Sequence, residues 1–162
     1  LARFNLNGQY LLPKAAALAR SFGMTPPVTN PYFNSVAQVV EMAQVLEHSI
    51  QLIDGLLTEG LRHDPPHVKP RAGNGAGCVE APRGILFHRY VFDERGICTA
   101  ANICIPTGQN GANIQKDFEA FAPLIIDRDP DEIRLLLEML VRAYDPCISC
   151  ATHFLKLEIR KD

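Results

Sequence analysis

The chain has 162 residues, 47% of them hydrophobic, and its 16 basic against 18 acidic residues leave a formal net charge of −2. This length corresponds to one domain with enough apolar residues to bury a core. A charge near zero provides no basic stripe for nucleic acid, and no apolar run of about 18 residues is available to span a membrane. We therefore expect a soluble globular piece that has no nucleic-acid partner and no membrane span.

Helix signals dominate the first part of the chain. Residues 11–22 form an alanine-rich stretch with Pro13 in a first-turn position. Over residues 31–61 apolar side chains recur at the spacing of one helix face, and Asn30 with Pro31 provides a cap and a first turn. Two helices are predicted here, of which the second is the longest in the chain.

The middle of the chain changes from loop to strand signals. Prolines and then glycines crowd residues 62–77, which predicts a loop. Residues 85–92 and 97–105 are rich in β-branched and aromatic side chains, as strands are. Between them, the run from Asp93 to Gly96 has the chemistry of a hairpin turn.

Two further helices are predicted over residues 114–125 and 130–142. The second opens with the acidic, proline-bearing residues 129–132, which complement the helix dipole. The elements together predict a helix-dominated α+β fold, in which long helices accompany a small antiparallel β-hairpin.

The closing motif DPCISCATH, residues 145–153, carries the sharpest chemical signal. Cys147 and Cys150 are separated by two residues, so both thiols can bind one metal ion or bond to each other, and His153 adds an imidazole. A structural zinc site usually needs a second such pair, which the chain lacks, so a metal held here takes its other ligands from elsewhere. Buried, inert thiols are the alternative. That inert role, filling small gaps in the core, is expected for the other three cysteines: Cys78, Cys98 and Cys104.

A second candidate is the arginine of the run EAPRG, which precedes the first predicted strand. Arg83 keeps its proton at ordinary pH, so it would present a fixed guanidinium to an anionic group. A surface or salt-bridged arginine is the alternative. Similarly, Thr107 follows a predicted strand end directly after Pro106, where a hydroxyl ordinarily belongs to a turn or a cap.

Taken in order, the runs EAPRG, ANICIPTGQN and DPCISCATH resemble the C-terminal half of the large subunit of nickel-iron hydrogenases. The similarity is to the cytoplasmic branch that serves NAD(P), deazaflavin or heterodisulfide partners. The opening LARFN and the run NPYFN also look like that branch, so the resemblance spans nearly the whole chain. Within this resemblance, the motif most specific to the family is DPCxxCxxH.

The resemblance implies a metal role for each donor in the closing motif. Cys147 corresponds to a terminal nickel ligand, and Cys150 to a thiolate that bridges nickel and iron. His153 matches a histidine that ligates magnesium in several relatives. Soft thiolate sulfur suits nickel, and two further thiolates would come from an RxCxxC motif in the family's N-terminal half.

Three more residues are implied around the iron, which in the family carries carbon monoxide and cyanides. Arg83 would hydrogen-bond one cyanide, Thr107 would contact the other, and Pro82 would shape the apolar wall. The implied reaction is reversible heterolytic splitting of H2 into protons and electrons, with Cys147 or Arg83 as the base.

The same resemblance implies partners, because the chain holds only part of the centre. Activity requires the RxCxxC-bearing N-terminal half of the large subunit. Electrons would leave through iron-sulfur clusters that a separate small subunit carries, and pass to further electron-acceptor subunits in the cytoplasm.

The domain organisation follows from the position of His153. We expect residues 1–153 to form the C-terminal half of the large subunit. Residues 154–162 would form a tail, which in family precursors a maturation endopeptidase removes. Because the chain opens on Leu1, a fragment, a split subunit and an unprocessed precursor all remain open.

Two other functions also remain open. The chain could be a non-catalytic relative similar to a component of complex I, or a zinc-binding or thiol-redox module that uses the CxxC motif.

Overall fold

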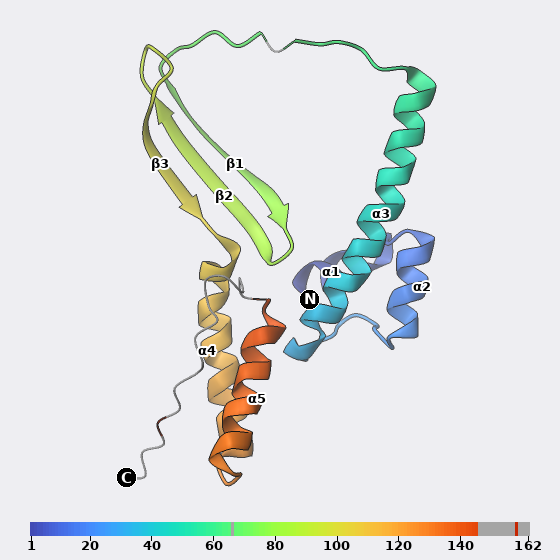
Figure 1. Cartoon of the computed structure of the whole chain (residues 1–162), viewed down its shortest axis with the longest axis vertical. Helices are drawn as coiled ribbons and strands as arrows, with labels where there is room; N and C mark the ends of the chain where they lie inside the picture. Colours follow the sequence, from blue (N-terminus) through green and yellow to red (C-terminus); the bar gives the residue numbers. More distant parts are fainter. Residues whose placement is uncertain (66, 146–157, 159–162) are drawn as a thin grey trace. The chain divides into compact units, whose positions relative to one another are not determined.

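The computed structural model describes residues 1–65, 67–145 and 158. These residues form two compact units (Figure 1). The helical unit comprises Leu1–Ser49 and Asn110–Asp162, and the sheet unit comprises Ile50–Gln109. No helix in the described part of the chain is long and apolar enough to cross a membrane.

The first two predicted helices are confirmed. The first is α2, Pro13–Ser21. The second opens with the 3-10 turn η2, Pro31–Phe33, and continues as α3, Asn34–Glu59. The side chain of Asn30 caps it by accepting a 3.0 Å hydrogen bond from the backbone N–H of Tyr32.

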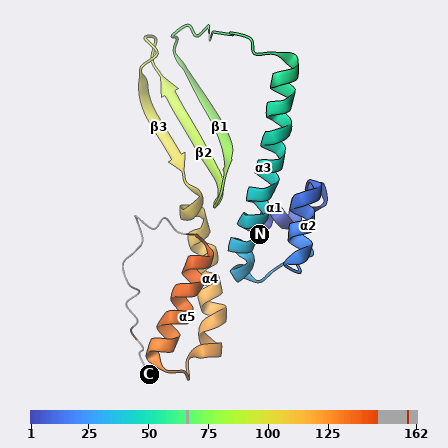
Figure 2. The ribbon, with the colours of Figure 1, turned by 45° about the vertical axis from the view of Figure 1, so that its right-hand side comes forward.

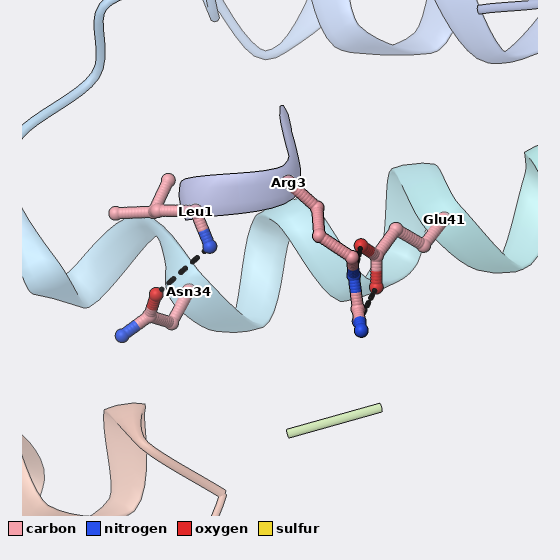
Figure 3. Close-up of polar contacts among 4 residues, drawn as sticks. All are labelled: Leu1, Arg3, Asn34 and Glu41. Atoms are coloured by element: carbon pink, nitrogen blue, oxygen red, sulfur yellow. Dashed lines mark hydrogen bonds and ion pairs between the residues drawn. The ribbon is translucent and has the colours of Figure 1, made fainter. Parts of the chain in front are cut away.

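A short helix that the sequence pattern did not predict, α1 (Ala2–Asn7), precedes them and is followed by the 3-10 turn η1, Gly8–Tyr10. Arg3 donates two hydrogen bonds of 2.7 and 2.8 Å to the carboxylate of Glu41, and the amino group of Leu1 donates to Asn34 Oδ1 at 3.1 Å (Figure 3). Tertiary contacts with α3 therefore hold a helix that is too short to be stable alone.

The core of this part consists of small residues around one aromatic ring. Phe4 of α1, two alanines of α2, and Ala37 and Val40 of α3 belong to one buried cluster. The buried members are Phe4, Ala15, Ala19, Met24, Ala37 and Val40.

The last two helices form an antiparallel pair that lies side by side in both views (Figures 1 and 2). Helix α4 runs over Pro106–Ile125 and α5 over Pro130–Ala143. The α5 prediction is confirmed, including its acidic start, where the Asp129 side chain accepts a hydrogen bond from the Asp131 N–H at 2.9 Å. The predicted start of α4 at residue 114 is wrong, since the helix begins at Pro106.

The sheet has three antiparallel strands in the order β1-β2-β3. Strand β2 (Gly84–Phe92) and strand β3 (Cys98–Cys104) confirm the predicted hairpin. Its turn is as expected: Asp93 Oδ1 accepts from the N–H of Arg95 and of Ile97, both at 2.9 Å, and Gly96 has φ +74°.

The third strand, β1 (Gly73–Ala81), shows that the predicted loop over residues 62–77 is too long. Residues 67–72 have no regular structure, but the glycines that follow pair with β2. Each of three alternate glycines pairs with a ring-bearing residue of β2, and a Cβ at any of the three would meet nothing within 4 Å. The pairs are Gly73 with Phe92, Gly75 with Tyr90, and Gly77 with His88.

Candidate functional site

Arg83 lies at the tip of the turn between β1 and β2. Ala81 pairs with Gly84, which leaves Pro82 and Arg83 as the two turn residues. Arg83 is half-buried and Pro82 is exposed. The prediction that EAPRG precedes the first strand is therefore corrected, since it forms a hairpin turn. A turn this tight restricts where the guanidinium can reach, and Pro82 restricts it further because its ring fixes φ.

Thr107 is the second residue of α4 and is half-buried. The predicted turn or cap position is thus the first turn of a helix, where unpaired N–H groups favour negative charge. Gly84, with φ +148°, lies against this turn: a Cβ at Gly84 would stand 3.2 Å from the Cβ of Pro106. The turn that carries Arg83 and the helix start that carries Thr107 therefore meet at one end of the sheet.

Gln109, which sequence reasoning missed, fixes this arrangement. Its Nε2 donates to the carbonyl of Ile85 at 2.8 Å and to the carbonyl of Cys104 at 3.3 Å. One amide thus joins the start of β2, the end of β3 and the first turn of α4. No sequence pattern marks this role, because the two carbonyls are contributed by segments that pair only in the folded sheet.

A second set of contacts, in the helical unit, fixes the end of α5. The Tyr144 hydroxyl donates a hydrogen bond to Asp117 of α4, and Gln38 of α3 donates to Asp145 Oδ2 at 3.3 Å. Burial comes first among the causes that raise the pKa of Tyr144 above its ordinary value of 10, followed by the hydrogen bond and the charge of Asp117. Asp145 has φ +49°, so the chain turns sharply where the closing motif begins.

The three donors of the closing motif, Cys147, Cys150 and His153, lie outside the described residues. Of the six site residues expected from the sequence, the structure places Pro82, Arg83 and Thr107. Pro82, Arg83 and Thr107 lie together at one end of the sheet.

The cysteines expected in the core are exposed instead, which corrects that prediction. Cys78 and Cys104 are paired with the same residue, Phe87, from opposite sides, so one strand separates their thiols. Two strand spacings amount to roughly 10 Å, too far for a disulfide. Both line an open hollow of about 380 Å³ on this sheet face. Within the described ranges, no three His, Cys, Asp or Glu residues gather to hold a metal.

Comparison with known proteins adds to this geometry. A family model described as nickel-dependent hydrogenase matches residues 28–153. The alpha subunit of sulfhydrogenase 2 from Pyrococcus furiosus is 33% identical over 158 residues, which cover 97% of this chain and 38% of that protein. An F420-non-reducing hydrogenase subunit of Methanothermobacter thermautotrophicus is 39% identical over 128 residues, covering 76% of this chain and 26% of that protein.

A solved structure is also similar. The crystal structure of an NAD+-reducing NiFe-hydrogenase in the H2-reduced state matches with a TM-score of 0.61 and 29% identity, over 88% of this chain and 32% of that one. The chain therefore spans between about a quarter and two fifths of these relatives.

Proposed function

The chain belongs to the nickel-dependent hydrogenase family, and from this premise we propose that it is the C-terminal part of a hydrogenase large subunit. In this proposal it supplies two of the four nickel thiolates for reversible heterolytic splitting of H2. The observation that carries the proposal is the family match, which continues through the closing motif to residue 153. The shared position of the Arg83 turn and the Thr107 helix start supports it.

The donor set of the closing motif suits the metals. Cys147 and Cys150 would hold nickel, Cys150 would also reach the iron, and His153 would hold magnesium, since soft sulfur prefers nickel and the harder ion accepts nitrogen or oxygen. When bound, a nickel-iron centre with carbon monoxide and cyanide on iron supplies the two-electron chemistry that separates H2 into protons and electrons.

The residues at the end of the sheet would bind and orient the anionic ligands of that centre. Arg83 offers a planar fork of N–H donors that stays charged at all working pH values. Thr107 adds a hydroxyl donor on a helix N-terminus, whose partial positive charge favours a cyanide. Pro82 would exclude water from the same region. The tight turn between β1 and β2 and the hydrogen bonds of Gln109 fix the positions of these groups, as a site for small ligands requires.

Each turnover of H2 releases two protons and two electrons, and a base must accept the first proton as the H–H bond breaks. We assign this step to the Cys147 thiolate or to Arg83. A thiolate is a base near neutral pH, whereas Arg83 would have to give up a proton before it could accept one. The guanidinium of Arg83 therefore acts more readily as a fixed positive charge than as a group that accepts the proton.

The proposal includes the rest of the enzyme. The remainder of the large subunit would supply the RxCxxC thiolates, a small subunit would carry iron-sulfur clusters, and further subunits would accept electrons in the cytoplasm. Residues 1–153 are then the functional part, and residues 154–162 a maturation extension that an endopeptidase removes. Mass spectrometry of the mature subunit would show a chain that ends at His153.

Substitution of Arg83 tests the proposal in the assembled enzyme. Arg83→Lys keeps the charge but loses the planar fork, so we expect H2-dependent dye reduction to fall at least tenfold while nickel content stays near that of the wild type. The matched control is Arg89→Lys, on the exposed part of β2, which should leave both values unchanged. Full turnover by Arg83→Lys would remove Arg83 from the site.

A further inference from the structure

Tyr144 and Asp145, which end α5 and open the closing motif, are held by side chains from two other helices of the helical unit. The Tyr144 hydroxyl donates a hydrogen bond to the carboxylate of Asp117 on α4. Gln38 Nε2 on α3 donates to Asp145 Oδ2 at 3.3 Å. All four residues are half-buried. We call Gln38, Asp117 and Tyr144 the α5 clamp.

The backbone at the same point is also constrained. The N–H of Tyr144 donates to the carbonyl of Val141 at 3.0 Å, and the N–H of Asp145 donates to that of Arg142 at 2.9 Å. Asp145 has φ +49°, a left-handed conformation that residues with a side chain rarely adopt and that persists where surrounding contacts hold it. The backbone bonds and the α5 clamp together fix the direction of the chain directly after α5.

The polar chemistry of the α5 clamp suits placement of the chain. Helices α4 and α5 also meet the start of α3 through other contacts: the rings of Tyr32 and Phe121 pack edge to face, and the Tyr32 hydroxyl donates to the carbonyl of Leu136 at 3.4 Å. Half-buried hydrogen bonds add only modest net stability, because both partners give up water, but their geometry is specific. The clamp therefore contributes a defined position more than it contributes stability.

The nickel donors expected from the sequence follow at once, since Cys147 lies two residues after Asp145. Metal ligands need partners that hold them in position, and those partners affect metal affinity although they do not bind the metal. Resting on the proposed function, we propose that Gln38, Asp117 and Tyr144 are positioning residues that place the closing motif for nickel binding. They act through the chain at Tyr144 and Asp145 and are not ligands themselves.

Removal of one hydroxyl tests the proposal in the assembled enzyme. Tyr144→Phe keeps the ring but loses the bond to Asp117, so we expect nickel per assembled chain to fall about tenfold. In the chains that keep the centre, the infrared bands of carbon monoxide and cyanide should shift. The matched control is Tyr32→Phe, which loses a hydroxyl bonded within α5 and should leave both values unchanged. Wild-type nickel with unshifted bands in Tyr144→Phe would overturn the proposal.

Two substitutions of Asp117 separate positioning from a general loss of folding. Asp117→Leu removes the acceptor and should match Tyr144→Phe, whereas Asp117→Asn keeps an oxygen acceptor and should retain most of the nickel. The double variant Tyr144→Phe/Asp117→Leu should lose no more nickel than either single variant, because both remove the same hydrogen bond. Losses that multiply in the double variant, or equal losses in the two Asp117 variants, would contradict the pairing.

A pair of glutamines on α3 tests the second contact of the clamp. Gln38→Leu loses the bond to Asp145, whereas Gln44→Leu loses a bond to the N–H of Leu12, which joins α3 to the start of α2. We expect nickel to fall in Gln38→Leu and to stay at the wild-type value in Gln44→Leu. Equal nickel in both variants would remove Gln38 from the clamp.

Hydrogen exchange over residues 144–150 of the same preparations separates this proposal from the proposed function. Faster exchange in Tyr144→Phe than in Tyr32→Phe, with no nickel in the wild type, would keep the positioning role and contradict the proposed function. Bound nickel in the wild type, with equal exchange and equal nickel in the two variants, would do the reverse.

Discussion

Gln109 joins three elements through one amide, and its substitution should show how far the candidate site depends on it. Gln109→Ala removes two hydrogen bonds to the carbonyls of Ile85 and Cys104, at a cost of about 1 kcal/mol in the free energy of unfolding. Gln109→Glu should cost more, because a carboxylate would face two carbonyl oxygens. Hydrogen exchange at the amide of Gly84 measures the loosening of the turn, with Gln51→Glu as the control. An unchanged exchange rate in both variants at position 109 would show that packing alone holds the turn.

At the same scale, the hydroxyl of Tyr144 predicts a pH dependence. The folded state raises the pKa of Tyr144, so the neutral phenol stabilises the fold fully below its ordinary value of 10 and this contribution is lost as the pH rises above it. At pH 8, Tyr144→Phe should lower the melting temperature. Above pH 10 the difference should shrink, because the wild type alone loses this contribution.

Thermal melting at pH 8 and pH 10.5 checks the Tyr144 prediction, with Tyr10→Phe as the control on an exposed tyrosine. A melting-temperature difference between wild type and Tyr144→Phe that stays constant with pH would contradict the raised pKa of Tyr144.

Among the elements, two glycines of the sheet should respond in opposite ways to the same substitution. Gly84→Ala forces a side chain into a positive-φ position and against Pro106, at a cost of about 1–3 kcal/mol. Gly75→Ala meets nothing within 4 Å and should be neutral or stabilise by up to about 1 kcal/mol. Urea unfolding of both variants measures the contrast, and equal effects would show that the turn tolerates a side chain.

The elements also show what sequence patterns can predict. Helix α3 followed from periodicity and its Asn30–Pro31 start, α2 from an alanine-rich run after Pro13, and α5 from its acidic, proline-bearing start, because these signals act within a few turns of one helix. Strand β1 did not, since its glycines have no strand preference and the strand forms through backbone pairing with β2. The early start of α4 was obscured by Gly108 and Gly111, which argue against a helix when tertiary contacts are unknown.

For the whole molecule, burial of the sheet residues could not be predicted, because it depends on parts of the large subunit that this chain does not contain. Sequence motifs indicated which residues belong to the candidate site. That the segments of Arg83 and Thr107 meet follows only from the folded structure, in which Gly84 lies against Pro106. The exposure of Cys78, Cys98 and Cys104 could not be foreseen. Their burial depends on what covers the sheet, and most of a large subunit lies outside this chain.

Metal analysis of the assembled enzyme tests the central claim most directly, namely that the thiols near residue 150 hold nickel. We predict one nickel per chain, accompanied by iron, in the wild type and in the control Cys98→Ser, whose exposed thiol lies on β3. We predict at least a tenfold loss of nickel in Cys150→Ser, because a hydroxyl is a poor bridging ligand. Zinc or no metal in the wild type, or full nickel in Cys150→Ser, would contradict the account.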